Sequence, residues 1–176
     1  MRQAVFLDRD GVINRAEVRE GKPYPPANLL AMEILPGVSQ ALISLHQAGL
    51  LLIVVTNQPD VGRGTMPREV VEEINNYLKI ALPIDEIRTC YHDSGDDCDC
   101  RKPLPGSLLA ASRVHEIDLS KSFMVGDRWR DVEAGQRAGC KTFFIDYGYA
   151  EKKPESCDYK VQSLREAANI ILKEMK

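Results

Sequence analysis

Residues 4–11 read AVFLDRDG, in which four apolar residues run directly into an acid, and a second acid and a glycine follow. A short apolar run of this kind is typical of a strand that is buried on both faces of a parallel sheet. Further strands are expected at residues 50–55, 86–90, 122–125 and 141–145. Amphipathic stretches separate these runs, and this alternation is the pattern of an α/β protein.

The stretches between the expected strands carry helical periodicity. Val38, Leu42 and Leu45 follow the i, i+4, i+7 spacing of one helix face, and Gly49 stands where a C-terminal cap belongs. Similar patterns predict helices from residue 67, over 105–115, over 132–138 and along 164–175. We therefore expect a single domain over residues 1–176, a Rossmann-like doubly wound parallel sheet with helices on both faces.

The composition is that of an ordinary folded protein. Hydrophobic residues make up 44% of the chain and charged residues 28%, which excludes a disordered polymer. The formal net charge of -3 argues against a general nucleic-acid-binding surface. No apolar run approaches the roughly 18 residues of a membrane span, and Asp8 interrupts the apolar stretch that a signal peptide needs. A cytoplasmic location is expected.

Polar residues stand where the expected strands end: Asp8 and Asp10 after the first, Thr56 after the second, Cys90 at the third and Asp127 after the fourth. In an open parallel sheet, ligands bind at the carboxyl ends of the strands. For any single strand end, a turn or a helix cap is the simpler explanation. Three polar strand ends, with two acids two residues apart, indicate a functional site instead.

The pair of acids favours phosphoryl-transfer chemistry. In an extended segment, Asp8 and Asp10 point to the same side, and two carboxylates that close repel each other unless a cation or a shared proton intervenes. Mg²⁺ would relieve this repulsion. One carboxylate could then attack phosphorus to form an aspartyl-phosphate, while the other protonates the leaving oxygen and later activates water. Thr56 and Lys102 are candidates for holding the phosphoryl oxygens.

Four short motifs follow one another along the chain: DRDG at residues 8–11, Thr56, RKP at residues 101–103 and GDRWRD at residues 126–131. In this order they resemble the haloacid dehalogenase superfamily, from residue 4 to about residue 149. The longer matches FLDRDG, VTNQ and CDCRKP are similar to the branch that contains heptose 1,7-bisphosphate 7-phosphatases and histidinol-phosphate phosphatases.

The resemblance implies a role for each matched residue. Asp8 would be the nucleophile, and Asp10 would be the general acid and base. Mg²⁺ would be bound by the Asp8 side chain, the Asp10 backbone carbonyl and the Asp127 side chain.

The remaining matched residues would hold the substrate. Thr56 and Lys102 would bind the transferring phosphoryl group, and Asp131 would orient Lys102 or a metal-bound water, or serve only as an acid in the first turn of a helix. Substrate contacts are expected from Asn57, Gln58, Arg101 and Arg128. Members of the superfamily often carry an inserted cap domain, but the expected helices and strands use most of the length between the motifs, so no cap domain is expected.

Four candidate zinc ligands precede the RKP motif. Cys90, His92, Cys98 and Cys100 are the ligand types of a structural tetrahedral Zn²⁺ site, although the C-x-H and C-x-C spacings are tighter than usual. The chain has five cysteines, so a pure disulfide framework would leave one unpaired. The resemblance supports zinc, because this branch carries such a loop. The alternative is a reactive or merely buried cysteine cluster.

The resemblance implies a Mg²⁺-dependent phosphatase that removes the 7-phosphate of D-glycero-D-manno-heptose 1,7-bisphosphate, in the biosynthesis of nucleotide-activated heptose for lipopolysaccharide and other surface polysaccharides. A histidinol-phosphate phosphatase of histidine biosynthesis is the alternative. The short spacing between His92 and Cys98 favours that alternative, whereas RKPLPG at residues 101–106 favours the heptose enzymes. A third hypothesis is a non-catalytic, zinc-stabilised binding module, against which the intact acids argue.

The stretch Asn14–Glu33 contains three prolines and matches neither kind of enzyme closely, so we expect it to be irregular. Its basic residues Arg15, Arg19 and Lys22 could contact a second phosphate or form a solvated surface. We expect a small phosphorylated sugar as substrate, no nucleic-acid or membrane partner, and a monomer.

Overall fold

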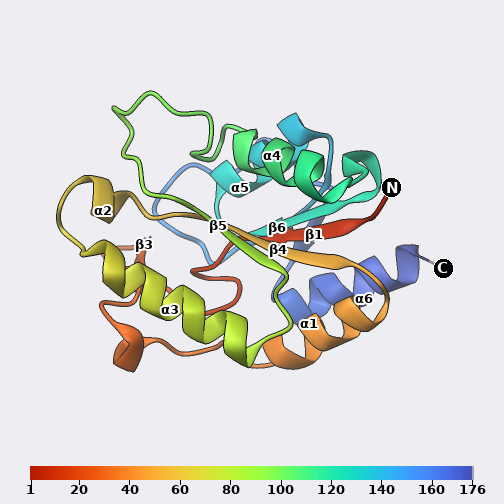
Figure 1. Ribbon diagram of the computed structural model, residues 1–176, viewed down its shortest axis with the longest axis horizontal. Helices are drawn as coiled ribbons and strands as arrows, with labels where there is room; N and C mark the ends of the chain where they lie inside the picture. Colours follow the sequence, from red (N-terminus) through yellow and green to blue (C-terminus); the bar gives the residue numbers. More distant parts are fainter. Residues whose placement is uncertain (176) are drawn as a thin grey trace.

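The computed structural model describes residues 1–175 and contains a sheet of six parallel strands (Figure 1). The order across the sheet is β5-β4-β1-β6-β7-β8. The strands are β1 (Ala4–Leu7), β4 (Leu51–Asn57), β5 (Glu86–Cys90), β6 (Phe123–Gly126), β7 (Lys141–Ile145) and β8 (Tyr159–Val161). The expected parallel α/β sheet is confirmed.

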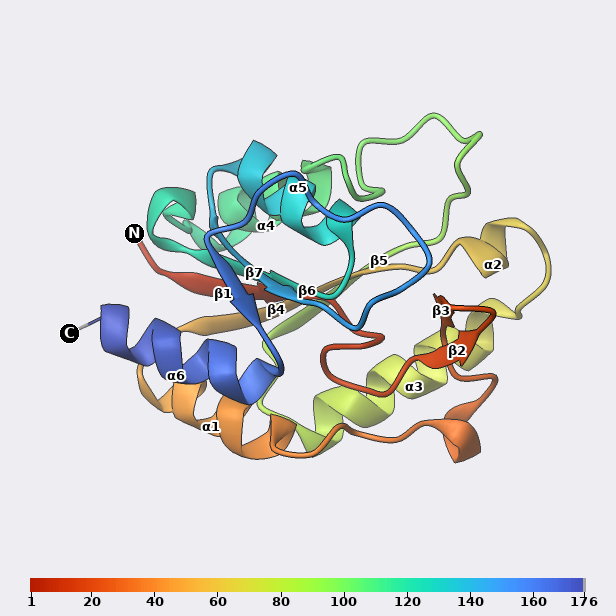
Figure 2. The same cartoon turned by 180° about the vertical axis from the view of Figure 1, so that it is seen from behind.

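Helices cover both faces of the sheet (Figures 1 and 2). One face carries α1 (Val38–Gln47), α3 (Arg68–Ala81) and α6 (Leu164–Glu174), and the other carries α4 (Gly106–His115) and α5 (Trp129–Ala138). Side chains of β1 alternate between two apolar clusters, because successive residues of a strand point to opposite faces. Val5 and Leu7 pack toward the first set of helices, and Ala4 and Phe6 toward the second.

The direction in which the chain crosses the sheet reverses at β1. From β1 the chain proceeds to β4 and then β5 on one side, and it returns to β6 on the other side of β1. Such a reversal leaves a crevice outside the carboxyl end of the central strand, where doubly wound sheets bind their ligands. Asp8 follows β1 directly and therefore lies at this crevice.

The stretch Asn14–Glu33 differs from the expectation of an irregular segment. It contains an antiparallel hairpin of β2 (Glu17–Arg19) and β3 (Lys22–Tyr24), and a short 3₁₀ helix at Leu29–Ala31. Glu20 and Gly21 both have positive φ angles, 49° and 75°, as a two-residue type I′ hairpin turn requires. The two strands are short and mostly exposed, so the sequence carries no apolar alternation that would predict them.

Three further elements and one boundary also differ. Strand β8, the single turn α2 (Pro59–Gly62) and a short 3₁₀ helix at Leu119–Lys121 were not expected, and α5 begins at Trp129 rather than at Val132. The earlier start has a capping cause, because the Asp131 carboxylate accepts a hydrogen bond of 3.0 Å from the Arg128 backbone N–H.

The intervals between the motifs build α2, α3, β5 and the cysteine loop, and in residues 1–175 no cap domain is inserted there. None of the helices described combines the length and the apolar character that crossing a bilayer requires.

Candidate active site

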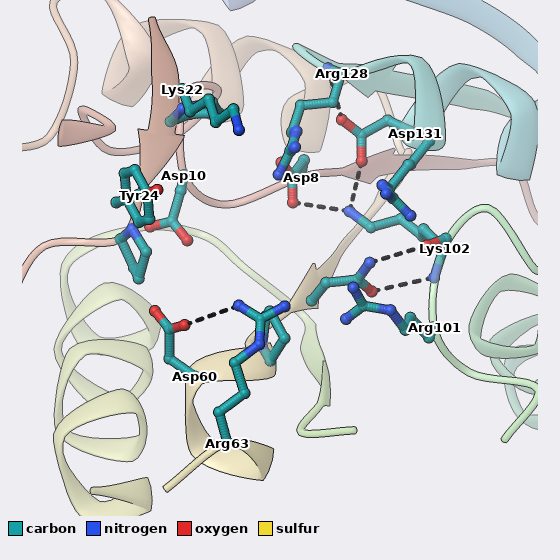
Figure 3. Close-up of a pocket in the computed structure, with 15 residues that line it drawn as sticks. Asp8, Asp10, Lys22, Tyr24, Asp60, Arg63, Arg101, Lys102, Arg128 and Asp131 are labelled. Atoms are coloured by element: carbon teal, nitrogen blue, oxygen red, sulfur yellow. Dashed lines mark hydrogen bonds and ion pairs between the residues drawn. The ribbon is translucent and has the colours of Figure 1, made fainter. Parts of the chain in front are cut away.

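The carboxyl ends of the central strands bring Asp8, Lys102 and Asp131 together (Figure 3). The ammonium nitrogen of Lys102 lies 2.8 Å from Oδ1 of Asp8 and 2.7 Å from Oδ1 of Asp131. It also donates a hydrogen bond of 2.6 Å to the backbone oxygen of Val55. The Lys102 residue is only 2% exposed, so this ion-pair network is shielded from water.

Burial and neighbouring charges perturb these groups. Burial raises the pKa of Asp8 to about 6, and the Asp131 charge adds to this rise while Lys102 opposes it. Burial alone would lower the pKa of Lys102, but the carboxylates of Asp131 and Asp8 outweigh it and the pKa of Lys102 is raised. Lys102 therefore keeps its positive charge, and the Asp8 carboxyl group holds its proton more tightly than an exposed aspartate does.

Asp127 is the third acid of the cluster and follows β6. It is 1% exposed, and burial together with the charge of Asp8 raises its pKa well above the usual value. Its Oδ2 atom accepts a hydrogen bond of 2.7 Å from the Tyr149 hydroxyl, whereas its buried Oδ1 atom has no hydrogen-bond partner. A Cβ atom at Gly11 would lie 2.0 Å from Oδ2 of Asp127, so this turn of the DRDG motif requires glycine.

The acid cluster fits a divalent cation. One carboxylate oxygen from each of Asp8, Asp127 and Asp131 lies within 4.8 Å of the other two. Carboxylate oxygens are the ligands that Mg²⁺ prefers, and the unpartnered Oδ1 atom of Asp127 is a buried acceptor that lacks a donor. Asp131 already accepts bonds from Lys102 and from the Arg128 backbone, so its geometry agrees with the orienting role that the sequence implies.

Asp10 is held by donors on three sides. Its Oδ1 atom accepts hydrogen bonds from Arg9 (Nη2, 3.1 Å) and Asn14 (Nδ2, 2.9 Å). Its Oδ2 atom accepts from Nε2 of Gln58 at 2.8 Å, and the same amide donates to Oγ1 of Thr56 at 2.9 Å. The resemblance implies a substrate contact for Gln58, whereas in the structure its side chain is buried and holds Asp10 and Thr56 in place.

Arg9 and Asn14 did not emerge from the sequence as functional residues. Arg9 is fully buried, and its Nη1 atom donates a hydrogen bond of 2.9 Å to the Asn75 side chain on α3. A basic residue between two acids was the signal that could have identified it. Its role depends on α3, however, which is far away in the sequence.

The backbone that carries Lys102 is anchored by Asn57. The Asn57 amide donates to the Lys102 carbonyl at 3.0 Å and accepts from the Lys102 N–H at 3.1 Å. Asn57 also lines the open pocket. The end of β4 and the RKP loop are thereby joined, although 45 residues separate them in the sequence.

The structure gathers the four candidate zinc ligands next to this loop. Sγ of Cys90 lies 3.5 Å from Nδ1 of His92, 4.0 Å from Sγ of Cys98 and 3.1 Å from Sγ of Cys100. Tetrahedral Zn²⁺ with Zn–S bonds of about 2.3 Å sets sulfur atoms about 3.8 Å apart. The Cys90–Cys98 distance agrees with this value, and the Cys90–Cys100 distance is shorter. The donor set fits a structural zinc ion.

Asp8, Lys102 and Asp131 line an open pocket of about 320 Å³ (Figure 3). The hairpin contributes Lys22 and Tyr24 to its wall. Arg15 and Arg19 instead form ion pairs with Glu33 and Glu17, which agrees with the solvated-surface interpretation for these two residues. Around the opening lie the basic side chains Lys22, Arg63, Arg101, Arg128 and Arg130. Of these, Arg63 and Arg130 were not expected from the sequence.

Comparison with known proteins supports the motif-based resemblance. The HAD-hydrolase-like family matches residues 99–167. The D-glycero-beta-D-manno-heptose-1,7-bisphosphate 7-phosphatase of Bordetella bronchiseptica is 35% identical over 153 residues, which cover 84% of this chain and 83% of that protein. The protein of the same name from Escherichia coli K12 is 34% identical and covers 98% of this chain and 95% of its own length.

Solved structures show the same fold. The crystal structure of D,D-heptose 1,7-bisphosphate phosphatase from B. bronchiseptica, complexed with magnesium and phosphate, superposes with a TM-score of 0.84 and 30% identity. The match covers 98% of this chain and 99% of that one. A HAD-like phosphatase from Mesorhizobium loti gives a TM-score of 0.78 at 26% identity, over 98% of this chain and 87% of that one. This chain belongs to the haloacid dehalogenase-like hydrolase family, and it is a phosphatase that cleaves phosphoric monoesters.

Proposed function

We propose that this protein is a Mg²⁺-dependent phosphatase that removes the 7-phosphate of D-glycero-D-manno-heptose 1,7-bisphosphate. The observation that carries the phosphatase chemistry is the contact of 2.8 Å between Asp8 and Lys102 at the carboxyl end of the central strand. The similarity to curated heptose bisphosphate phosphatases along nearly the whole chain supports the substrate. The corresponding pathway is the synthesis of nucleotide-activated heptose for surface polysaccharide.

In the first half of the proposed reaction, an oxygen of Asp8 attacks phosphorus, and the bond between phosphorus and the sugar oxygen breaks. Asp10 donates a proton to the departing sugar oxygen. The product is an aspartyl-phosphate on Asp8. Lys102 and Thr56 stabilise the charge on the transferring phosphoryl oxygens.

In the second half, Asp10 accepts a proton from a water molecule whose oxygen attacks the same phosphorus. The bond between phosphorus and Asp8 breaks, and inorganic phosphate leaves. Donors from Arg9, Asn14 and Gln58 keep the Asp10 carboxyl group in one place during both proton transfers.

The Asp8 and Asp127 side chains, with the Asp10 backbone carbonyl, are the proposed Mg²⁺ ligands. When bound, Mg²⁺ supplies positive charge that screens the phosphate from the buried acids. The unpartnered Oδ1 atom of Asp127 supports this assignment, because a buried carboxylate oxygen without a donor is otherwise unfavourable. A relative of the same fold binds magnesium and phosphate.

The proposed role of Zn²⁺ at Cys90, His92, Cys98 and Cys100 is structural. Four protein ligands leave no open position for water. The cluster ends one residue before Arg101, whose Nη1 atom donates a hydrogen bond of 3.0 Å to the backbone oxygen of His92. Closing the loop around zinc therefore positions the RKP segment over the pocket.

The test of the substrate is phosphate release in the presence of Mg²⁺. The values of kcat/KM are compared for both anomers of heptose 1,7-bisphosphate and for histidinol phosphate. We expect a heptose bisphosphate to be preferred at least 100-fold, which corresponds to about 2.7 kcal/mol of differential transition-state binding. A preference for histidinol phosphate would refute the proposed substrate and leave the proposed catalytic roles intact.

The test of zinc is elemental analysis of protein purified without added metal. We expect about one zinc ion per chain, and loss of that ion in Cys98→Ser. Cys157→Ser is the matched control, because Cys157 lies outside the cluster. Metal-free protein with an unchanged melting temperature would contradict the assignment.

A further inference from the structure

The pocket wall holds more positive charge than its own acids neutralise. Six cationic and four acidic side chains line it. Three of the cations have carboxylate partners: Lys102, Arg63 and Arg128. Within residues 1–175, the other three form no salt bridge: Lys22, Arg101 and Arg130. These three cations are therefore available to a bound anion.

Among these three cations, Arg130 is held against an aromatic ring. Its guanidinium carbon lies 4.5 Å from the centre of the Trp129 ring, a distance at which cation and aromatic face attract each other. The residue is half-buried and lines the pocket. Arg101 and Arg128 line the same pocket, so three guanidinium groups share its wall. In agreement with this, burial and the charges of Arg128 and Arg101 lower the pKa of Arg130.

The position of Arg130 in the helix makes the crowding informative. Arg130 is the second residue of α5, and Arg128 is the N-cap. The helix dipole disfavours positive charge at a helix N-terminus, so neither arginine stabilises α5 through the dipole. Arg137, by contrast, lies in the last turn of the same helix and pairs with Glu133, as stability favours. A bound anion would offset both the repulsion between Arg130 and the neighbouring arginines and the unfavourable interaction of Arg130 with the helix dipole.

We infer that Arg130 is a specificity-determining residue that binds a second anionic group of the substrate, away from the phosphoryl group held beside Lys102. The inference rests on the proposed function and deepens it, because it names a residue that would distinguish a sugar bisphosphate from a sugar monophosphate. A guanidinium can donate two parallel hydrogen bonds to one phosphate, and the Trp129 ring limits the orientations it must give up on binding.

The experiment compares two ligands that share the phosphate to be cleaved. Heptose 1,7-bisphosphate and heptose 7-phosphate are titrated calorimetrically, with Mg²⁺, into Asp8→Asn protein, which we expect to bind without turnover. The same protein is then prepared with Arg130→Gln, with Arg130→Lys and with the control Arg137→Gln. The matching active proteins, with Asp8 intact, are assayed for kcat/KM on both sugars.

We expect Arg130→Gln to reduce the preference for the bisphosphate at least 10-fold, in Kd and in kcat/KM. Arg130→Lys should retain most of the preference because the charge remains, and Arg137→Gln should retain all of it. An equal loss on both sugars, or none on either, would overturn the inference. So would Asp8→Asn protein that does not prefer the bisphosphate at all. The proposed function fails separately, if the unaltered protein releases no phosphate from heptose 1,7-bisphosphate.

Discussion

The buried cluster that we call the floor (Asp8, Lys102, Asp127 and Asp131) and the rim of the pocket (Lys22, Arg63, Arg101, Arg128 and Arg130) are built in different ways. The floor residues are almost fully buried, and the positive charge of Lys102 lies between two carboxylates. The rim residues are half-buried or exposed, and they come from a hairpin, the turn α2, the cysteine loop and the start of α5.

This difference suits the floor residues to catalysis and the rim residues to the selection of the substrate. Groups that attack phosphorus or stabilise its transition state must be held in fixed positions during the reaction, and burial among fixed partners holds them there. Charges that distinguish one sugar from another contact the substrate where the pocket meets water, and they can vary without disturbing the sheet. Substitutions in the floor should therefore affect turnover or stability strongly, and substitutions in the rim should affect substrate preference.

The largest expected effect is on turnover in Asp8→Asn. The amide cannot form the aspartyl-phosphate, so kcat should fall by at least about 10³-fold. The fold should persist, because burial already raises the pKa of Asp8 and an uncharged amide is tolerated there. Phosphate release and the circular dichroism melting temperature are the measurements, with exposed Glu155→Gln as the control. Substantial activity in Asp8→Asn would show that another group is the nucleophile.

Removing the central cation tests the floor through stability. Lys102→Met leaves the buried carboxylates of Asp8 and Asp131 without their counter-ion, and the free energy of unfolding should fall by about 3–5 kcal/mol. In contrast, Lys121 pairs with Asp118 at 3.9 Å on the surface, so Lys121→Met should change it by less than about 1 kcal/mol. Urea unfolding without added Mg²⁺ measures both. Similar values for the two variants would remove the distinction between floor and surface.

Magnesium should stabilise the folded protein more at pH 7.5 than at pH 5. Burial raises the pKa of Asp8 from 3.8 to about 6, so between these values the folded, metal-free protein holds a proton that the unfolded chain has lost. The stability of the metal-free protein therefore falls as the pH rises through this window. At pH 7.5, above its pKa of about 6, Asp8 binds the cation without proton competition.

Melting temperatures with and without Mg²⁺ at the two pH values check this prediction. Asp127→Asn should abolish most of the Mg²⁺-dependent shift, because it removes a proposed ligand. A shift that is equal at both pH values, or one that persists in Asp127→Asn, would contradict the assignment of the acids.

The smallest effect is expected in the rim. Lys22→Ala should raise KM for the sugar bisphosphate about 5-fold and change kcat little, because a partly exposed ionic contact contributes about 1 kcal/mol. Lys121→Ala is the control, since Lys121 pairs with Asp118 on the surface and does not line this pocket. A fall in kcat without a change in KM would place Lys22 in the reaction itself and weaken the comparison between floor and rim.

The sequence alone determined the sheet and most of the floor. Apolar runs predict β1, β4, β6 and β7 because buried parallel strands need continuous apolar residues. Since parallel strands end at one edge, Asp8, Thr56 and Asp127 were expected to lie close together. In the structure a carboxylate oxygen of Asp8 and one of Asp127 lie within 4.8 Å of each other.

Tertiary structure alone decided what surrounds these acids. The Arg9–Asn75 contact, the Tyr149–Asp127 hydrogen bond and the buried position of Gln58 each join segments that are distant in the chain, and no local pattern predicts such partners. The strands of the hairpin and β8 have only three residues each, so they carry little of the apolar alternation by which a strand is predicted. No motif in the sequence marks Arg130 as a functional residue. Only the position of α5 at the pocket places its charge near those of other cations.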